Sequence, residues 1–131
     1  MRTAVLGAAG QLGRDLCPRL PGEITPLTRA DLDLEKPDTI ATYLAANRPD
    51  VLVNCAAYNF VDKAEADPGP AFAANGLGVR LLALACAAAG VKLVHVGTDY
   101  VFGLDAARST PFTEVTPPGP VSAYGLSELV G

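Results

Sequence analysis

The sequence predicts an α/β fold of the Rossmann type, a doubly wound parallel sheet with helices on its faces. Apolar runs of strand length alternate with helix-length stretches along the 131 residues, as in consecutive βαβ units. A glycine-rich turn, Gly7 to Gly13, directly follows the first apolar run. Right-handed crossovers then predict the strand order 3-2-1-4, with the switch point between strands one and four. Gly7–Gly13, Ala56–Tyr58 and Thr98–Tyr100 all follow predicted strands and are expected to converge on one crevice there.

The individual elements follow from local sequence signals. Strands are predicted over residues 3–6, 23–27, 51–55 and 93–96, and helices over 11–20, 37–47 and 70–89. Pro37 opens the second helix and Gly90 ends the third. Gly76 and Gly78 lie inside the third helix, where glycine is costly, which predicts close packing against the sheet. Residues 103–122 are rich in Pro, Thr, Gly and Ser and predict a surface loop. A last helix begins near Ser122 and continues to Gly131.

Composition restricts the classes of partner. Half of the residues are hydrophobic, 18% are charged, and the formal net charge is -4. Without a cluster of Lys and Arg, a surface for nucleic acid or anionic membrane is not expected. No signal-peptide pattern follows Met1, and no apolar run is expected to approach the roughly 20 residues that are needed to span a bilayer. The expected location is therefore the cytoplasm.

The cysteines and the single histidine predict structural roles. Cys17, Cys55 and Cys86 are far apart in sequence and have no CxxC spacing or histidine partner, so they are expected to be free, buried thiols rather than disulfide or metal ligands. His95 lies within an apolar strand. It is expected to be a hydrogen-bonded residue of the sheet rather than a catalytic base.

The turn Gly7-x-x-Gly10-x-x-Gly13 predicts a phosphate-binding site. Glycines permit a tight turn and let backbone N–H groups approach a dinucleotide pyrophosphate at a helix N-terminus. Glycine triplets also occur in ordinary turns, but the position between a strand and a helix favours cofactor binding.

The residues after the second strand give a mixed signal for the choice of cofactor. An acidic residue about 20 positions beyond the turn usually contacts the ribose 2′-hydroxyl of NAD, whereas a nearby arginine suits the 2′-phosphate of NADP. Arg29, Asp31 and Asp33 all occur here. Asp33-Leu34 is alternatively expected beside the adenine, and Asp31 is alternatively a helix or turn cap.

Tyr124 and Glu128 are one helical turn apart and share a helix face. A tyrosine that protonates a carbonyl during hydride transfer needs a neighbouring cation, because its unperturbed pKa is about 10. Glutamate at the fourth position instead raises the pKa of the phenol. The alternative is that Tyr124 only packs at the start of the helix.

Six segments together resemble the dTDP-4-dehydrorhamnose reductases of the extended short-chain dehydrogenase/reductase superfamily. The resemblance covers the whole chain, and 61–65 with 98–102 are its most specific parts. The matching segments are Gly7–Gly13, Arg48–Val51, Val53–Tyr58, Val61–Glu65, Thr98–Phe102, and Pro111–Glu114 leading to Tyr124-Gly125.

The resemblance implies reduction of the C4 ketone of a dTDP-4-dehydro-6-deoxysugar by NADPH or NADH, in dTDP-L-rhamnose synthesis. It implies that Thr98 hydrogen-bonds the ketone oxygen and that Tyr124 protonates it. The implied cofactor residues are Gly7, Gly10, Gln11, Leu12, Gly13, Asp33, Leu34, Ala56, Ala57 and Tyr58. The implied substrate residues are Val61, Asp62, Lys63, Thr98, Asp99 and Tyr100. Asp15 falls where some members place an acidic residue of a magnesium-bridged dimer, but no metal site is predicted here.

Two departures from that pattern define the alternatives. Glu128 stands where the family has a catalytic lysine, and the chain stops where the family continues with further strands and a substrate-binding lobe. The expectation is an N-terminal, cofactor-binding part of a longer reductase, able to form a homodimer. The alternative is a non-catalytic homologue that binds a nucleotide or a partner, similar to the regulatory beta subunit of methionine adenosyltransferase.

Overall fold

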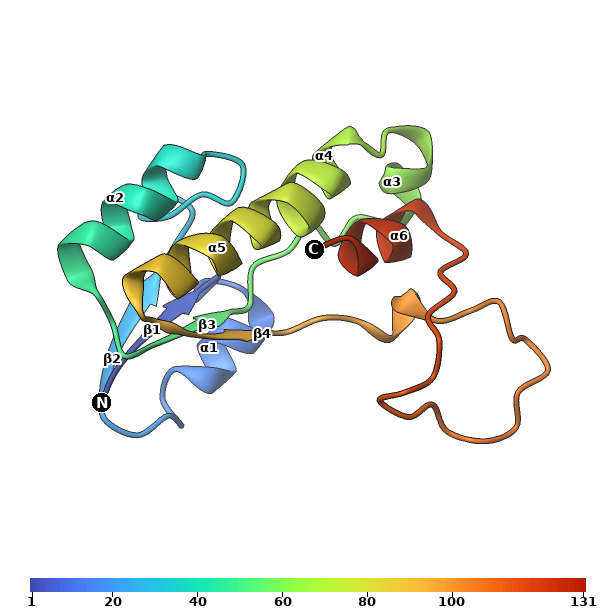
Figure 1. The fold of residues 1–131 in the computed structure, drawn as a ribbon, viewed down its shortest axis with the longest axis horizontal. Helices are drawn as coiled ribbons and strands as arrows, with labels where there is room; N and C mark the ends of the chain where they lie inside the picture. Colours follow the sequence, from blue (N-terminus) through green and yellow to red (C-terminus); the bar gives the residue numbers. More distant parts are fainter.

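The computed structural model covers residues 1–131 and contains one four-stranded parallel sheet. Its strands are β1 (Arg2–Leu6), β2 (Glu23–Leu27), β3 (Val51–Asn54) and β4 (Lys92–His95), in the order β2-β1-β3-β4 (Figure 1). The expected α/β class with a parallel sheet and flanking helices is therefore confirmed. Residues 3–6 of β1 are all buried, as in a strand covered on both faces.

The predicted strand order 3-2-1-4 is wrong. The third strand pairs with β1 and not with β2, so that Val5 lies between Pro26 on one side and Val53 on the other. Proline has no N–H to donate to a neighbouring strand and is confined to sheet edges, and Pro26 identifies β2 as the edge strand. The chain therefore returns across β1 after β2, and the switch point lies between β1 and β3.

The shorter helices follow the predictions with two differences. Helix α1 spans Gln11–Leu16 rather than 11–20, because Pro18 cannot donate a hydrogen bond to continue it. Helix α2 (Pro37–Asn47) and α6 (Ala123–Leu129) form where expected, and Ser122 caps α6 by accepting a hydrogen bond from Gly125 N. A further helix, α3 (Val61–Ala66), was not predicted.

The long central helix is continuous but irregular. It comprises α4 (Gly69–Ala71), a π-helical segment (Phe72–Gly78) and α5 (Val79–Ala89). Its glycines do not face the sheet as predicted. A Cβ on Gly76 would lie 2.9 Å from Val130 Cγ2, beyond α6, and one on Gly78 would lie 2.6 Å from the Leu34 carbonyl oxygen. The two glycines therefore let the helix approach the α6 end and the segment after β2.

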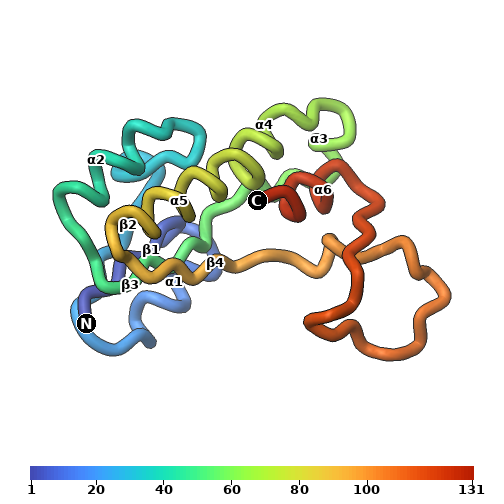
Figure 2. The backbone as a smooth tube through the Cα atoms, viewed as in Figure 1, coloured from blue at the N-terminus to red at the C-terminus, as the bar shows by residue number.

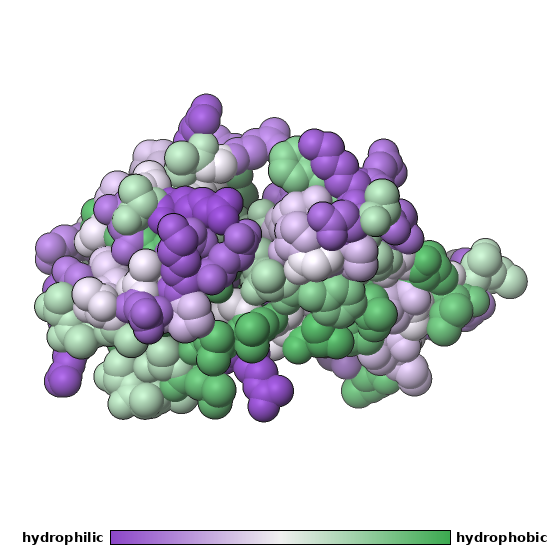
Figure 3. Space-filling model, turned by 90° about the horizontal axis from the view of Figure 1, so that it is seen from above, coloured by the Kyte–Doolittle hydropathy of each residue, from purple (hydrophilic) through white to green (hydrophobic).

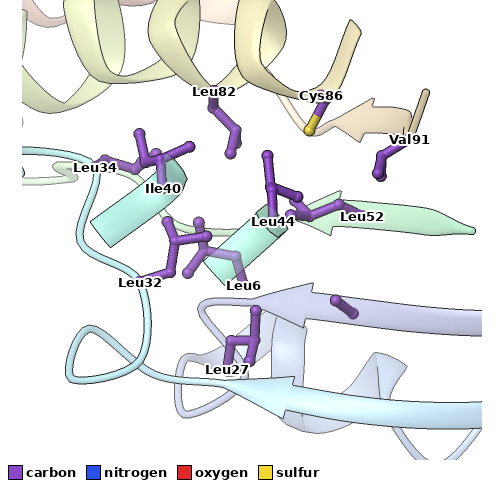
Figure 4. Close-up of a cluster of buried hydrophobic side chains, with 11 residues drawn as sticks. Leu6, Leu27, Leu32, Leu34, Ile40, Leu44, Leu52, Leu82, Cys86 and Val91 are labelled. Atoms are coloured by element: carbon purple, nitrogen blue, oxygen red, sulfur yellow. The ribbon is translucent and has the colours of Figure 1, made fainter. Parts of the chain in front are cut away.

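The main core lies between the sheet and the helices α2 and α5, which lie side by side on one face (Figure 1). Side chains from β1, β3, α2 and α5 converge there, among them Leu6, Leu52, Ile40 and Leu82 (Figure 4). Helix α1 lies on the other side of the sheet (Figure 1), with Gly13 as its one buried residue. A second, smaller cluster of Ala64, Ala71 and Tyr124 joins α3, α4 and α6.

Residues 102–122 extend away from the sheet as a long irregular loop, as predicted (Figure 2). Phe102 and Phe112 stack within it with ring centroids 4.2 Å apart. Arg108 lies over the Phe112 ring and donates to the carbonyl oxygens of Thr110 and Pro111. Gly119 N donates to Val101 O, and Leu104 N donates to Gly119 O, so the loop closes on itself near its base.

The expectation that no apolar segment is long enough to span a bilayer is wrong, because one helix has the length and the composition of a membrane-spanning segment. The helix Gly69–Ala89 has 21 residues, and an 18-residue window within it has a mean hydropathy of 1.6. The core helix of a globular domain passes the same test, and Val79, Leu82 and Cys86 of this helix are buried. Leu77 and Leu84 are exposed, and hydrophobic residues gather along one edge of the helical face (Figure 3).

Two leucines of α5 allow a matched test of the main core. Leu82→Ala should destabilise the fold by about 2–5 kcal/mol, because it removes a fully buried side chain and leaves a cavity. Leu84→Ala, on the same helix with 59% exposure, should change stability by less than about 1 kcal/mol. Urea unfolding followed by circular dichroism measures both. Equal losses for the two variants would contradict this placement of the core.

Candidate functional site

The glycine-rich turn after β1 is held by backbone contacts that only glycine allows. Gly7 adopts φ +80°, and a Cβ there would lie 2.8 Å from Ala56 N, at the end of β3. A Cβ on Gly13 would lie 2.6 Å from Ala8 Cα. The turn therefore packs against the end of the neighbouring strand and against the start of α1 without side chains in between.

The same turn leaves backbone donors free. Arg14 N is the first amide of α1 that donates a hydrogen bond to the preceding turn, and its acceptor is Gly10 O. The N–H groups of Gln11, Leu12 and Gly13 donate to no protein acceptor, as is general in the first turn of a helix. Gln11 and Leu12 are exposed and Gly13 is buried. This arrangement fits a phosphate group, which accepts such donors and is favoured by the helix dipole.

A cleft of about 370 Å³ opens beside this turn, at the carboxyl ends of β1, β2 and β3. It contains seven of the ten residues predicted to bind cofactor, namely Gly7, Gly10, Asp33, Leu34, Ala56, Ala57 and Tyr58. The cleft lies at the switch point between β1 and β3, where ligands bind in open parallel sheets. Thr98–Tyr100, predicted to converge on the same crevice, do not line it.

Charged residues after β2 form one wall of the cleft. Asp33 is 5% exposed, accepts a hydrogen bond from Glu35 N at 3.0 Å, and pairs with Arg29 Nε at 3.1 Å. Burial acts to raise the pKa of Asp33, but these hydrogen bonds and nearby cations outweigh it and lower the pKa. Asp31 instead accepts from Thr28 N and Oγ1, both at 2.8 Å, which confirms its interpretation as a turn cap.

The predicted catalytic tyrosine lies in a second, adjacent group of residues. Tyr124 is 7% exposed and packs on Ala64 and Ala71. The Tyr100 ring meets it edge to face at 5.5 Å between centroids. Thr98 caps the 3₁₀ turn Asp99–Val101 by accepting from Tyr100 N, and it lies close enough to Tyr124 to act on the phenol's pKa. The structure thus brings Thr98, Tyr100 and Tyr124 together.

Glu128 has the location and the effect that its spacing predicts. It is 9% exposed, on the same face of α6 as Tyr124. Burial raises the pKa of Tyr124, and the negative charge of Glu128 raises it further, while Thr98 acts in the opposite direction. Burial also raises the pKa of Glu128 itself. The phenol therefore has an anion where the expected lysine would place a cation.

Asn75 connects the two groups and was not identified from the sequence. It lies in the π-helical segment with 1% exposure. Its side chain accepts from Tyr58 N at 2.7 Å and donates to Tyr58 O at 3.0 Å and to Ser127 Oγ at 3.2 Å. Ser127 Oγ in turn donates to Tyr124 O at 2.7 Å. An asparagine inside an alanine-rich helix, where it is disfavoured, was the available signal.

Helix α3 carries the predicted substrate residues. Val61 packs against the Tyr124 cluster, while Asp62 and Lys63 are exposed. Lys63 Nζ lies 4.7 Å from the centre of the exposed Phe60 ring. Glu65, from the same motif, accepts a hydrogen bond from Ala123 N at 2.7 Å. Glu65 thereby caps the helix that carries Tyr124. Asp99 is exposed.

The remaining candidates have structural positions. His95 Nδ1 lies 3.0 Å from Asn54 Nδ2 within the sheet, which confirms a hydrogen-bonded residue, and burial lowers its pKa. The three cysteines are free, with Cys86 buried and the other two half-buried. Asp15 is exposed and pairs with Arg19. No group of three or more His, Cys, Asp or Glu residues is arranged to hold a metal ion.

The raised pKa of Glu128 predicts a pH-dependent effect of Glu128→Gln. The folded state holds this proton to a higher pH than the unfolded state does, so the stability contribution of Glu128 is lost as pH rises from about 4.5 through its folded pKa. Glutamine stays neutral throughout. The stability of the variant relative to the parent should therefore increase with pH over this range.

Thermal unfolding of both proteins from pH 3.5 to pH 8 measures this difference. The lowered pKa values of Asp31 and Asp33 act in the opposite direction, but they are common to both proteins and cancel. A difference that does not vary with pH would show that Glu128 is not desolvated in the fold.

Comparison with known proteins identifies the family. The chain matches the RmlD substrate binding domain over residues 1–131. It is 44% identical to a dTDP-4-dehydrorhamnose reductase of Burkholderia thailandensis, over 100% of this chain and 44% of that protein. The chain therefore spans less than half of the length of this relative.

Solved structures agree with this assignment. A dTDP-4-dehydrorhamnose reductase of Bacillus anthracis in complex with NADP superposes with a TM-score of 0.92 at 35% identity, covering 98% of this chain and 46% of that one. A UDP-glucose 4-epimerase of Thermus thermophilus in complex with NAD superposes at 0.80 with 28% identity, covering 98% and 47%. The chain belongs to the RmlD substrate binding domain family.

Proposed function

We propose that this chain is the cofactor-binding part of an NAD(P)H-dependent reductase acting on the C4 ketone of a dTDP-4-dehydro-6-deoxysugar. The observation that carries the proposal is the cleft at the β1–β3 switch point, where the Gly7–Gly13 turn and Ala56–Tyr58 meet. Relatives named dTDP-4-dehydrorhamnose reductase support the reaction class.

In this proposal the cofactor lies along the cleft. The free N–H groups at residues 11–13 bind its phosphates, as the open first turn of α1 permits. Asp33 and Leu34 border the adenosine end, and Ala56 to Tyr58 border the nicotinamide end. The Asn75 contacts to both backbone groups of Tyr58 hold this segment in place.

The reduction then depends on Thr98 and Tyr124. When bound, the reduced nicotinamide supplies a hydride to the ketone carbon. Thr98 would hydrogen-bond the ketone oxygen, and the Tyr124 hydroxyl would donate the proton that it gains. Val61, Asp62, Lys63, Asp99 and Tyr100 would contact the sugar nucleotide from α3 and from the turn after β4.

One observation favours a second candidate function. Glu128 takes part in no ion pair, and it raises the pKa of the tyrosine that would have to donate the proton. A homologue that binds a nucleotide or a partner protein without catalysis needs no such proton donor. The cleft and its cofactor-binding turn would be retained in that case, so cofactor binding alone does not separate the two candidates.

Titration with NADPH and NADH tests the cofactor-binding proposal. Nucleotide fluorescence or calorimetry should show binding to the chain. Gly13→Ala should abolish it, because the new Cβ would lie 2.6 Å from Ala8 Cα and displace the turn. Gly97→Ala is the matched control, since nothing lies within 4 Å of its Cβ. No binding of either dinucleotide at millimolar concentration would refute the proposal.

Glu128→Lys tests the catalytic role. A lysine would restore a cation near the Tyr124 phenol, and such electrostatic support of proton transfer is typically worth about 10²–10⁴ in rate. We expect slow NADPH oxidation with the dTDP-4-keto sugar for the parent and orders-of-magnitude faster oxidation for the variant. Cofactor affinity should change far less, because the glycine-rich turn is untouched.

This assay is run on the 131-residue chain and on a version extended to the length of the curated relatives. Equal rates for the parent and for Glu128→Lys would mean that another residue supplies the charge. Catalysis absent from both lengths of chain despite cofactor binding would favour the non-catalytic candidate.

A further inference from the structure

Arg29 stands at the edge of the cleft with its guanidinium already engaged. Its Nε lies 3.1 Å from Asp33 Oδ2, and its Nη2 lies 3.0 Å from Glu35 Oε2. The side chain is 69% exposed and belongs to the residues that line the cleft. Two sides of the donor fork are therefore occupied by carboxylates before any ligand arrives.

The two carboxylates are held differently. Asp33 has a side chain only 7% exposed and also accepts from Glu35 N, so it is fixed by the fold. Glu35 has a side chain 36% exposed, and Arg29 is its one ion-pair partner. Since an exposed ion pair contributes little to stability, Glu35 is the partner that a ligand could displace.

The charges of this cluster balance, so that it offers a second anion no net attraction. Arg29 and Lys36 carry two positive charges, and Asp33 and Glu35 carry two negative ones, with Lys36 Nζ 3.8 Å from Asp33 Oδ2. A phosphate monoester on the ribose would add about 1.5 to 2 negative charges to this neutral cluster. A ribose 2′-hydroxyl would add none. Without a ligand, the cluster therefore holds no unpaired positive charge for a 2′-phosphate.

We propose that Glu35 sets the cofactor preference of this chain by occupying the part of Arg29 that a 2′-phosphate would bind. The proposal rests on the proposed function and specifies its cofactor selectivity. NADPH must displace Glu35 from Arg29 before it gains a bidentate phosphate contact, whereas NADH binds without disturbing the pair. The chain therefore has little preference for NADPH, although it carries an arginine at the position that suits a 2′-phosphate.

Equilibrium titration of NADPH and NADH against Glu35→Gln tests this directly. The variant frees Arg29 while preserving the size of the side chain. We expect NADPH affinity to rise about three- to fivefold, in line with one exposed ion pair, and NADH affinity to stay within about twofold. Glu23→Gln is the matched control, since it makes the same charge change at the opposite end of β2. It should alter neither affinity.

A double-variant cycle separates competition for Arg29 from simple repulsion. In Arg29→Gln the preference should move toward NADH, and adding Glu35→Gln should no longer strengthen NADPH binding. If the gain persists without Arg29, direct repulsion by Glu35 is responsible and the proposal is overturned. Melting curves establish that each variant is folded, and if Arg29→Gln does not fold, the same cycle is run with Arg29→Met, which also removes the charge and the donor groups of Arg29 while keeping a long side chain.

The remaining outcomes are distinguishable. If the parent chain binds neither dinucleotide, the proposed function fails. If it binds both, and Glu35→Gln changes the two affinities equally or not at all, the proposed function stands and the role of Glu35 is refuted.

Discussion

The arrangement of the site depends on the close approach of the Gly7 turn to the end of β3. No atom larger than hydrogen fits on Gly7 beside Ala56 N, and none fits on Gly13 beside the turn itself. This contact requires β1 and β3 to be neighbours, which they are. It also brings Gly7 and Gly10, which precede the open first turn of α1, to the same cleft as the segment Ala56–Tyr58, although Gln11, Leu12 and Gly13 do not line that cleft.

A second constraint keeps the tyrosine helix in a fixed position relative to that cleft. The chain of hydrogen bonds from Tyr58 through Asn75 and Ser127 reaches the backbone of Tyr124. The buried amide of Asn75 uses both its oxygen and its nitrogen, so its loss would leave buried polar groups unpaired. The π-helical segment that contains Asn75 also contains Gly76, which admits the α6 end. The irregular segment of the helix therefore lies at the point where the helix meets α6.

Local patterns predicted most elements but not how they are arranged. The bounds of α2 and β2 agree with the sequence-based prediction, because Pro37 and Pro49 flank α2 and Gly22 directly precedes β2, and both kinds of residue are local signals. The strand order was wrong because pairing is non-local, and Pro26 was the one residue that marked the edge. The positions of Gly7–Gly13 and Ala56–Tyr58 after predicted strands placed these segments at the crevice, and the family resemblance supplied the individual cofactor residues. Asn75 did not, since its partners Tyr58 and Ser127 are 17 and 52 positions away.

Position 128 shows that packing and chemistry constrain a residue separately. On the face of α6 that packs against the 3₁₀ turn and the central helix, the space for a side chain is nearly closed. The close packing of α6 on the 3₁₀ turn is possible because Gly125 has no side chain and lies directly against the Tyr100 backbone. Glutamate fits this space, at the cost of a desolvated carboxyl with a raised pKa. The Glu128 carboxylate has no ion-pair partner, and Tyr124 is the group whose pKa its charge raises. A substitution here can therefore preserve the fold and the cofactor cleft while it changes the proton donor, because the cleft is built from β1, β2 and β3 and not from α6.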